Sequence, residues 1–428
     1  MKNPALVALL AGLVAACGSS TTTDPAPAPP VTEPAPTEPP VVQPPPPVVD
    51  HGAVSEKYPA FTPAMGQIAD NGGAVLKNPV IVTVTWPDDL KANELENFGD
   101  TVGAGQYWKD TVSEYGSNAA VSGEANHIRL PDAAPATFSD KELSAFVATN
   151  VANKTFPTPL TGDPVYILYL PKTTSLLLSG KSACAQGIGG YHDSVKVDIK
   201  SVAYAIVPRC GSSFESVTVT ASHELVEAAS DPYPRSRPAW TGFRSEDLAW
   251  EFFQQLQSEN GDACEFYHDS RLAAGESDVA YSVQRSWSNV SAAAGHDPCV
   301  PAFKNTAFFN TTPLSLEDVN VDLSSLGGGT MTTKGIKVAV GATKTIPLGF
   351  YSDGPVSSWT IKALPGGIAG GKSGGVDLSL DVTDGQNGQK AYLTITVNTA
   401  GKTGSELITI VSQRGSRSHY MPILIASE

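Results

Sequence analysis

The spacing of apolar residues changes once along this chain, near residue 305, and that change limits the folds it can adopt. From residue 306 onward, apolar and polar residues alternate in short runs such as IKVAV (336–340) and AYLTITV (391–397). Gly, Asn and Asp separate these runs, and no helical period is present. Several short strands joined by regular turns predict an immunoglobulin-like β-sandwich over residues 306–428, which we expect to be an all-β accessory domain.

Before that point, apolar segments alternate with segments that suit helices. Four segments have the composition of strands: residues 79–86, 163–171, 201–208 and 280–287. Helices are expected within 89–115, with a break near Gly103, and from 140 to about 153 after a Ser139 cap. Because strands and helices alternate, we predict an α+β or α/β fold for residues 51–305.

The start of the chain predicts where the protein works. Residues 5–16 form an apolar run that is shorter than the roughly 20 residues a membrane-spanning helix needs. The run ends in Val-Ala-Ala before Cys17, which resembles the bacterial lipobox. We therefore expect residues 1–17 to be a lipoprotein signal peptide and Cys17 to carry the lipid. The alternative is an ordinary secretory signal with an incidental Cys.

A proline-rich, low-complexity segment follows at residues 18–50 and predicts an extended linker. The expected location is therefore outside the cytoplasm, lipid-anchored at the outer membrane or cell surface, with the bilayer as one partner. The net charge of the chain is −15, and its basic residues are scattered. Nucleic acid is excluded as a partner on this ground, because it rewards clusters of Lys and Arg.

Four cysteines remain after Cys17, an even number that suggests two disulfides in an exported protein. They are Cys184, Cys210, Cys264 and Cys299. Three pairings are possible. We favour Cys184–Cys210 with Cys264–Cys299, because both bonds then close short loops.

The strongest chemical signal lies in residues 216–232, SVTVTASHELVEAASDP. We expect a helix that Ser216 caps and Pro232 ends, and apolar residues around its axis predict that it is largely buried. One polar stripe runs along it at spacings of three and four residues: Thr220, His223, Glu227 and Asp231. Buried carboxylates and an imidazole are unfavourable unless they pair or bind a cation, so the stripe predicts a site.

His223 and Glu227 lie one helical turn apart and can bind the same metal ion, with Glu224 beside them as general base for a water molecule. The arrangement resembles the H-E-x-x-H helix of zinc peptidases, with Glu227 at the position of the second His. Zn²⁺ is therefore the expected cofactor. Ca²⁺ is the alternative, because several acidic oxygens also suit that ion.

Four blocks, in this order, resemble the phosphate-induced, EXORDIUM-like family and its bacterial relatives. They are Ser222-His223-Glu224-Leu225 with Glu227; Ser230-Asp231-Pro232; Ala239-Trp240; and Glu259 with Gly261, Asp262 and Cys264. The blocks span about half of residues 51–305 and none of the predicted β-sandwich. The resemblance implies an extracellular protein with a metallopeptidase-like helix, without assigning a reaction.

The third metal ligand is expected from outside the polar stripe or from its end. Asp262 and Glu259 are preferred, in a turn that a disulfide at Cys264 can anchor. Asp231 is a second candidate, although it can instead brace the turn before Pro232. His192 is a third, either as a ligand or as a hydrogen-bond donor to the transition state.

Two functions agree with these residues. The first is an exported zinc-dependent hydrolase, a peptidase acting on extracellular or envelope protein. The second is a non-catalytic surface lipoprotein that binds glycan or protein. In that protein, Glu227, Glu259 and Asp262 would form a buried network with His223 and Arg244.

Overall fold

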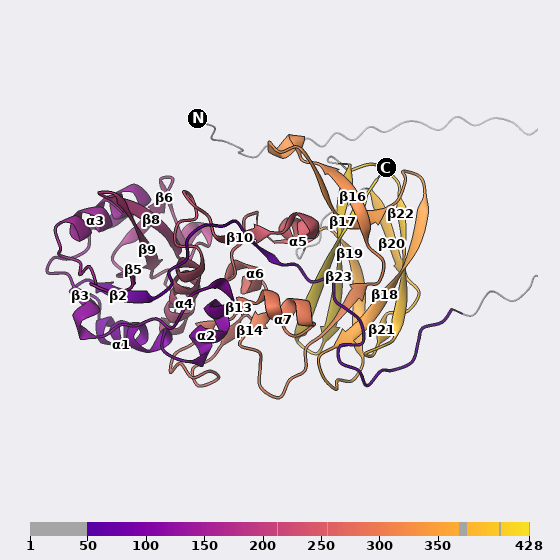
Figure 1. Cartoon of the computed structure of the whole chain (residues 1–428), viewed down its shortest axis with the longest axis horizontal. Helices are drawn as coiled ribbons and strands as arrows, with labels where there is room; N and C mark the ends of the chain where they lie inside the picture. Colours follow the sequence, from indigo (N-terminus) through magenta and orange to yellow (C-terminus); the bar gives the residue numbers. More distant parts are fainter. Residues whose placement is uncertain (1–48, 212, 255, 368–374, 402–403, 428) are drawn as a thin grey trace, which may run out of the picture. The chain divides into compact units, whose positions relative to one another are not determined.

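The alternating strands and helices of the first 305 residues build a sheet with helices on both faces. The computed structural model describes residues 49–211, 213–254, 256–367, 375–401 and 404–427. Its central sheet has the order β3-β2-β5-β9-β8. The strands are β2 (Pro79–Thr85), β3 (His127–Arg129), β5 (Asp163–Leu170), β8 (Tyr191–Val197) and β9 (Lys200–Pro208). The first four in that order run parallel, and β8 lies antiparallel to β9 at the edge (Figure 1).

Helices cover both faces because alternate residues of each strand point in opposite directions. The main helices are α1 (Ala92–Val102), α2 (Gln106–Val112), α3 (Asp140–Ala152) and α4 (Phe214–Ser230). In β2, Ile81 packs in one core with α1, α2 and α4. Its neighbour Val82 packs in a second core with α3. The result is three layers, with the sheet between the two sets of helices.

The local patterns identified these elements well. The helix after Ser139 begins with a full capping box between that residue and Glu142, and α1 ends directly before Gly103. Residues 280–287, in contrast, do not form one strand. They form β12 (Val283–Gln284) and β13 (Ser286–Trp287), which pair with β11 (Arg271–Leu272) and β14 (Cys299–Val300), respectively. Arg285 separates them, because its side chain is buried against Asp297.

Shorter elements surround this sheet. They are β1 (Ile68–Asp70), β4 (Thr137–Ser139), β6 (Ser175–Leu178), β7 (Lys181–Ser182), β10 (Trp240–Phe243), α5 (Leu248–Phe253), α6 (Asp262–Glu265) and α7 (Asn289–Ala294). Short 3-10 helices occur at η1 (Ser113–Tyr115), η2 (Glu124–Asn126), η3 (Cys184–Gln186), η4 (Ser245–Asp247) and η5 (Ser324–Leu326).

Residues after 305 form two sheets, with the orders β15-β18-β22-β20 and β16-β17-β24-β23-β19-β21. The strands are β15 (Phe309–Pro313), β16 (Glu317–Asp322), β17 (Thr330–Lys337), β18 (Thr343–Ser352), β19 (Trp359–Pro365), β20 (Val376–Leu380), β21 (Asp384–Gly385), β22 (Lys390–Val397), β23 (Ser405–Arg414) and β24 (Arg417–Ala426). Side chains from both sheets, such as Ile395 and Ile410, share one core, so the two sheets form a β-sandwich. The protein as described is therefore mostly β-sheet with few helices.

Strand β24 was not predicted, because Pro422 interrupts its pattern. Pro lacks the N–H that a sheet ladder uses. Pro422 is paired in register with Thr409 of β23. On its other side, β17 pairs with β24 only at Ile425 and Ala426, so no residue of β17 lies opposite Pro422 to receive an N–H.

The same core continues into residues before 305. Trp250, Phe253 and Trp287 belong to it together with sandwich residues such as Ile336 and Ile425. Residues 50–428 accordingly form one compact unit.

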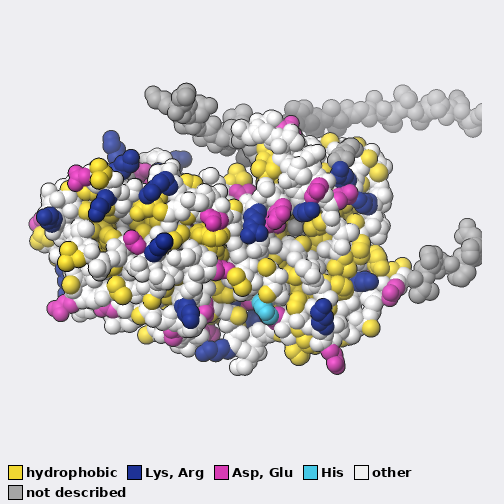
Figure 2. All heavy atoms as spheres, in the orientation of Figure 1, with side chains coloured by type: hydrophobic (Ala, Val, Ile, Leu, Met, Phe, Trp, Pro, Cys, Tyr) yellow, Lys and Arg dark blue, Asp and Glu magenta, His cyan; other side chains and the backbone are white. Residues whose placement is uncertain are grey.

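The predicted signal peptide, with Cys17, lies outside the described residues, as does nearly all of the predicted linker. Within the described ranges, no helix has both the length and the apolar character needed to cross a membrane. On the face in Figure 2, Lys and Arg side chains are dispersed among acidic ones rather than gathered in one patch.

The shared core yields a first prediction. A fragment of residues 50–305 leaves Trp250, Phe253 and Trp287 without their sandwich partners. Each large apolar side chain contributes about 1.5–3 kcal/mol when buried, so we expect the fragment to lose several kcal/mol of unfolding free energy. Calorimetry should find one cooperative transition for residues 50–428 and a much lower melting temperature for the fragment. Equal melting temperatures would contradict a shared core.

Candidate metal centre

Helix α4 follows β9 and supplies three side chains of the site. Its cap is Ser213, whose hydroxyl accepts from the Ser216 N–H, rather than Ser216 as the sequence suggested. Apolar residues including Val217 and Leu225 pack the helix against the central sheet. The helix is buried on almost every side, as its composition predicted, and Glu224 and Glu227 are buried with it.

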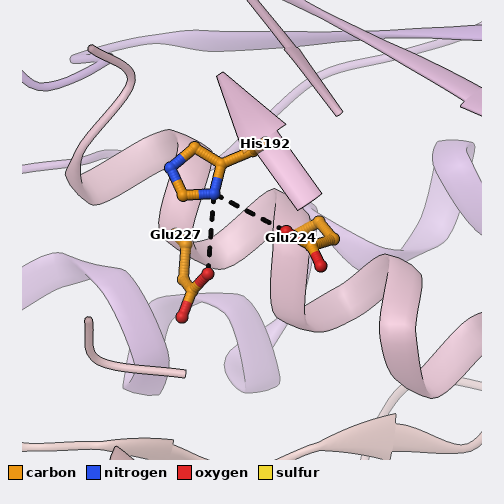
Figure 3. Close-up of side chains that lie close together, drawn as sticks. All are labelled: His192, Glu224 and Glu227. Carbon is orange, nitrogen blue, oxygen red and sulfur yellow. Dashed lines mark ion pairs between the residues drawn. The ribbon is translucent and has the colours of Figure 1, made fainter. Parts of the chain in front are cut away.

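His192 comes from edge strand β8, whose pattern YHDSVKV had not been recognised as a strand. Its neighbours Tyr191 and Val195 pack on the α3 side of the sheet, so His192 faces α4. His192 Nδ1 lies 3.6 Å from Glu224 Oε2 and 3.5 Å from Glu227 Oε2. Figure 3 shows both carboxylates directed at that nitrogen. We call His192, Glu224 and Glu227 the inner triad.

The other nitrogen of His192 is also held. Its Nε2 lies 3.1 Å from the main-chain carbonyl oxygen of Asp231 and 3.3 Å from Glu259 Oε2. Because Nε2–H can donate to these oxygens, Nδ1 is left directed at the two glutamates of α4. A histidine that binds a metal is usually oriented in this way through its second nitrogen.

A second triad shares Glu227. His223 Nε2 lies 3.1 Å from Glu227 Oε2 and 3.6 Å from Asp262 Oδ1. The Asp262 N–H donates to Glu227 Oε1 at 3.0 Å, which fixes the carboxylate. We call His223, Glu227 and Asp262 the outer triad. It is the more accessible one, since the Asp262 side chain is 30% exposed and that of His192 only 5%.

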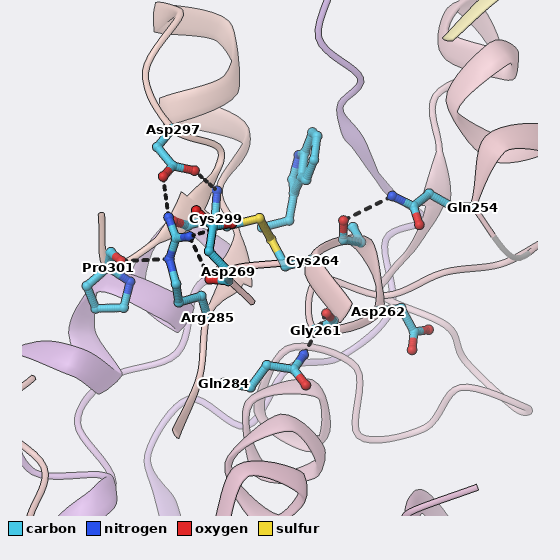
Figure 4. The surroundings of a disulfide bond; sticks show 12 residues. Gln254, Gly261, Asp262, Cys264, Asp269, Gln284, Arg285, Asp297, Cys299 and Pro301 are labelled. Atoms are coloured by element: carbon cyan, nitrogen blue, oxygen red, sulfur yellow. Dashed lines mark hydrogen bonds and ion pairs between the residues drawn. A yellow bond between two sulfur atoms is a disulfide. The ribbon is translucent and has the colours of Figure 1, made fainter. Parts of the chain in front are cut away.

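The turn that carries Glu259 and Asp262 is anchored at several points. The Glu259 N–H donates to Asp262 Oδ2, and Asn260 Oδ1 accepts from the Ser230 hydroxyl at the end of α4. Cys264 follows in α6 and is bonded to Cys299. Figure 4 shows this disulfide close behind the Asp262 turn. The turn therefore presents its acids to α4 from a fixed position.

Both disulfides match the favoured pairing. Cys184 is bonded to Cys210, and Cys264 to Cys299. Two such bonds indicate an oxidising compartment, which is the extracellular or periplasmic space.

Gln284 is a site residue that no sequence pattern indicated. Its side-chain Nε2 donates to the Gly261 carbonyl at 2.9 Å (Figure 4). The same nitrogen lies 2.8 Å from His223 Nδ1. An amide nitrogen only donates, so in neutral His223 the Nδ1 atom accepts and the ring proton lies on Nε2, facing Glu227. A cation at Nε2 replaces that proton and requires the amide to turn over, so that its oxygen accepts from Nδ1–H.

The histidines are in strongly negative surroundings. Burial alone would lower the pKa of His192, but the charge of Glu259 and the neighbouring glutamates of α4 hold it well above its usual value. Burial acts in the same direction on His223, and Glu227 beside it again raises the pKa well above the usual value. Both sites therefore favour positive charge.

The acids divide into two kinds. Burial alone would raise the pKa of Glu227, but His223 beside it lowers that pKa below its usual value. Burial raises the pKa of Glu224, and that of Glu259 still further. Burial and the charge of Glu227 together raise the pKa of Asp262 to about 7. Glu227 is therefore the acid that ionises most readily, and the other three favour their neutral forms unless positive charge is brought close to them.

The positive charge that would balance these acids when they are ionised does not come from arginine in the described structure. Among the residues that the structure describes, the ion pairs of the four acids are with His192 and His223. Arg244, which the sequence suggested as a network partner, instead lies 3.9 Å from Glu246. A buried network based on Arg244 is thus wrong, because that residue follows β10 and points to another acid.

The remaining candidate ligands are placed as follows. His223, Glu224, Glu227, Glu259, Asp262 and His192 all meet in this cluster. Asp231 contributes its carbonyl oxygen, whereas its carboxylate accepts from the Ala239 N–H at 2.9 Å and braces the turn after α4.

The separations fit a metal ion. Ligand atoms about 2.0–2.2 Å from a tetrahedral zinc ion are about 3.3–3.6 Å apart. The ion-pair distances within the two triads run from 3.1 to 3.6 Å. The ligand atoms of each triad also lie within 4.8 Å of one another.

Comparison with known proteins adds little. No family model matches the chain, and no curated protein matches it. Among solved structures, a chimeric titin Z1Z2 is 14% identical over 27% of this chain and 98% of its own, with a TM-score of 0.17. The periplasmic chaperone SfaE is 15% identical over 22% of this chain and 55% of its own, also with a TM-score of 0.17. Likeness at this level carries no argument about function.

Two glycines allow the close packing of the site, and they yield a second prediction. A Cβ on Gly190 would lie 2.7 Å from Glu224 Oε1, and one on Gly261 would lie 2.7 Å from Glu227 Oε1. Such overpacking costs about 1–3 kcal/mol, so Gly190→Ala and Gly261→Ala should each lower the urea midpoint of unfolding. Gly329→Ala, where a Cβ meets nothing within 4 Å, is the control and should leave the midpoint unchanged.

Proposed function

We propose that this protein is an exported, metal-dependent hydrolase whose outer triad binds a divalent cation, zinc by preference. One observation carries the proposal. Five side chains from β8, α4 and the Glu259–Asp262 turn converge with ligand-like separations, and Glu259 lies behind His192. The described residues bring no Lys or Arg to the four acids. A buried group of this charge is unfavourable unless a cation balances it.

The residues present suit a reaction on a carbonyl group. His223, Glu227 and Asp262 would hold the cation, and the 30% exposure of Asp262 gives this side access to solvent. Zinc held there would polarise a carbonyl group and lower the pKa of a water molecule. Glu224, next to His223 on α4 and buried, is the carboxylate we assign to accept the proton of that water.

The substrate class we propose is protein or peptide. The support is the resemblance of the α4 residues to the helix of zinc peptidases, with Glu227 at the position of the second His. An exported location gives access to extracellular or envelope protein.

A non-catalytic surface protein is the second candidate, and the orientation of Gln284 favours it. As placed, its amide donates to His223 Nδ1 and leaves the ring proton on Nε2, where a cation would bind. His223 Nε2–H would then donate to Glu227 Oε2, 3.1 Å away, and hydrogen bonds would hold the cluster without metal. This candidate predicts no bound metal and a large loss of stability for Glu227→Ala, because His223 and His192 would lose their partner.

Metal content separates the two candidates and is the third prediction. We expect purified residues 50–428 to hold stoichiometric zinc by elemental analysis, and His223→Ala to lose it. His296→Ala is the control, since that side chain is 55% exposed and pairs with Asp353 instead. Metal missing from the parent chain and from both variants would eliminate the hydrolase.

Turnover tests the assigned base. Glu224→Gln keeps the size of the side chain and removes its charge, so we expect hydrolysis of unfolded casein to fall at least about hundredfold. Zinc should remain in the outer triad of this variant. Full activity of a variant that keeps its zinc would show that Glu224 is not the base.

The proposal also includes a lipid tether at Cys17, which rests on the lipobox-like Val-Ala-Ala-Cys pattern. The fifth prediction follows. We expect the full chain to fractionate with membranes and Cys17→Ser to be released. Mass spectrometry of the N-terminal peptide should find acyl chains on Cys17. An unmodified Cys17 in the mature protein would rule out the tether.

A further inference from the structure

The candidate centre contains more metal-binding side chains than one ion needs. A catalytic zinc takes three protein ligands, whereas four carboxylates and two imidazoles meet here. Five of the six divide into two triads that have only Glu227 in common, and Glu259 belongs to neither. His192 has Glu224 and Glu259 as its other partners, and His223 has Asp262.

From this division we propose that the centre binds two divalent cations, the second in the inner triad of His192, Glu224 and Glu227, with the Glu227 carboxylate bridging them. The inference rests on the proposed function and changes its stoichiometry. Glu227 Oε2 is the atom that approaches both histidines, at 3.5 Å from His192 Nδ1 and 3.1 Å from His223 Nε2. Paired ions in hydrolytic sites are typically about 3.5–4 Å apart, a spacing that a shared carboxylate can provide.

The charge of the cluster supports two ions rather than one. Glu224, Glu227, Glu259 and Asp262 carry four negative charges when ionised. One divalent cation with neutral imidazoles leaves two of these charges unbalanced in a site where Glu224 and Glu227 are each 4% exposed. Unbalanced buried charge is unfavourable, so acids left without a cation would take up protons instead. Two divalent cations leave the cluster neutral.

The inner triad is already oriented for binding. His192 directs Nδ1 at Glu224 and Glu227, while Nε2 is held by the Asp231 carbonyl. Glu259 Oε2 lies 3.3 Å from that nitrogen, is buried, and has no hydrogen-bond partner. A buried carboxylate oxygen directed at the far side of the imidazole makes the ring a stronger ligand.

The two positions differ in access to solvent. The side chains of the inner triad are each 5% exposed, whereas Asp262 of the outer triad is 30% exposed. The inner cation is therefore enclosed and slow to exchange, and the outer cation faces the substrate. With both ions bound, Glu224 holds the inner one through Oε2, the oxygen nearest His192, and its Oε1 is left to accept the proton. Its substitution therefore changes metal content as well as turnover.

Zinc stoichiometry, measured by native mass spectrometry on residues 50–428, tests this inference. We expect two ions on the parent chain and one on His192→Ala, Glu224→Gln and Asp262→Asn. Glu246→Gln, an acid outside the cluster that lies near Arg244, is the control and should keep two. Glu224→Gln preserves size and so guards against misfolding as the cause.

The outcomes separate the two proposals. One zinc on the parent chain, retained by Glu224→Gln, overturns the second cation and leaves the single-ion hydrolase intact. No zinc on any of the chains overturns both. Dialysis against a chelator adds a kinetic readout. The parent chain should release its zinc in a fast phase and a slow phase. The slow phase should be absent from His192→Ala, because that variant lacks the enclosed inner site.

Discussion

The architecture around α4 depends on one electrostatic constraint, the confinement of four carboxylates and two imidazoles in a largely apolar interior. An unpaired buried carboxylate is unfavourable by several kcal/mol, and no arginine or lysine among the described residues pairs with these four. The balancing positive charge must then come from protons on His192 and His223 or from bound cations. The functional hypotheses for this protein differ in whether protons or bound cations supply this positive charge.

The scaffold holds that charge by fixing three separate elements. Helix α4 is packed against the central sheet, β8 is paired along its length with β9, and the Glu259–Asp262 turn is tied by Asn260 and by the Cys264–Cys299 disulfide. The turn is also tied directly to α4, because Asn260 accepts from Ser230 and the Asp262 N–H donates to Glu227. Side chains held in this way lose little further freedom when a ligand binds, and rigid placement of this kind is what a binding site requires.

The β-sandwich takes part in this support. Gln284, which contacts His223, is followed by Arg285, whose buried guanidinium binds Asp297 and the carbonyls of Asp269, Cys299 and Pro301. Arg417 of β24 lies 3.7 Å from the same Asp269, and Trp287 belongs to the core shared with the sandwich. The segment behind the site is thus attached to residues on both sides of position 305, so the sandwich contributes to the stability of the centre.

The sequence by itself determined the local elements, because hydrophobic periodicity and caps act over a few residues. The strands at 79–86 and 163–171, the Ser139 cap and α4 with its polar stripe were all predicted in this way. The disulfide pairing was favoured by loop length. Only the tertiary structure decided which side chains lie against the polar stripe of α4. His192 reaches it through a strand whose polar pattern resembles a loop, and Gln284 through a two-residue strand with no pattern at all. Arg244, a plausible partner by charge, lies elsewhere. Contacts between residues far apart in the chain depend on how whole elements pack, and no local periodicity encodes that.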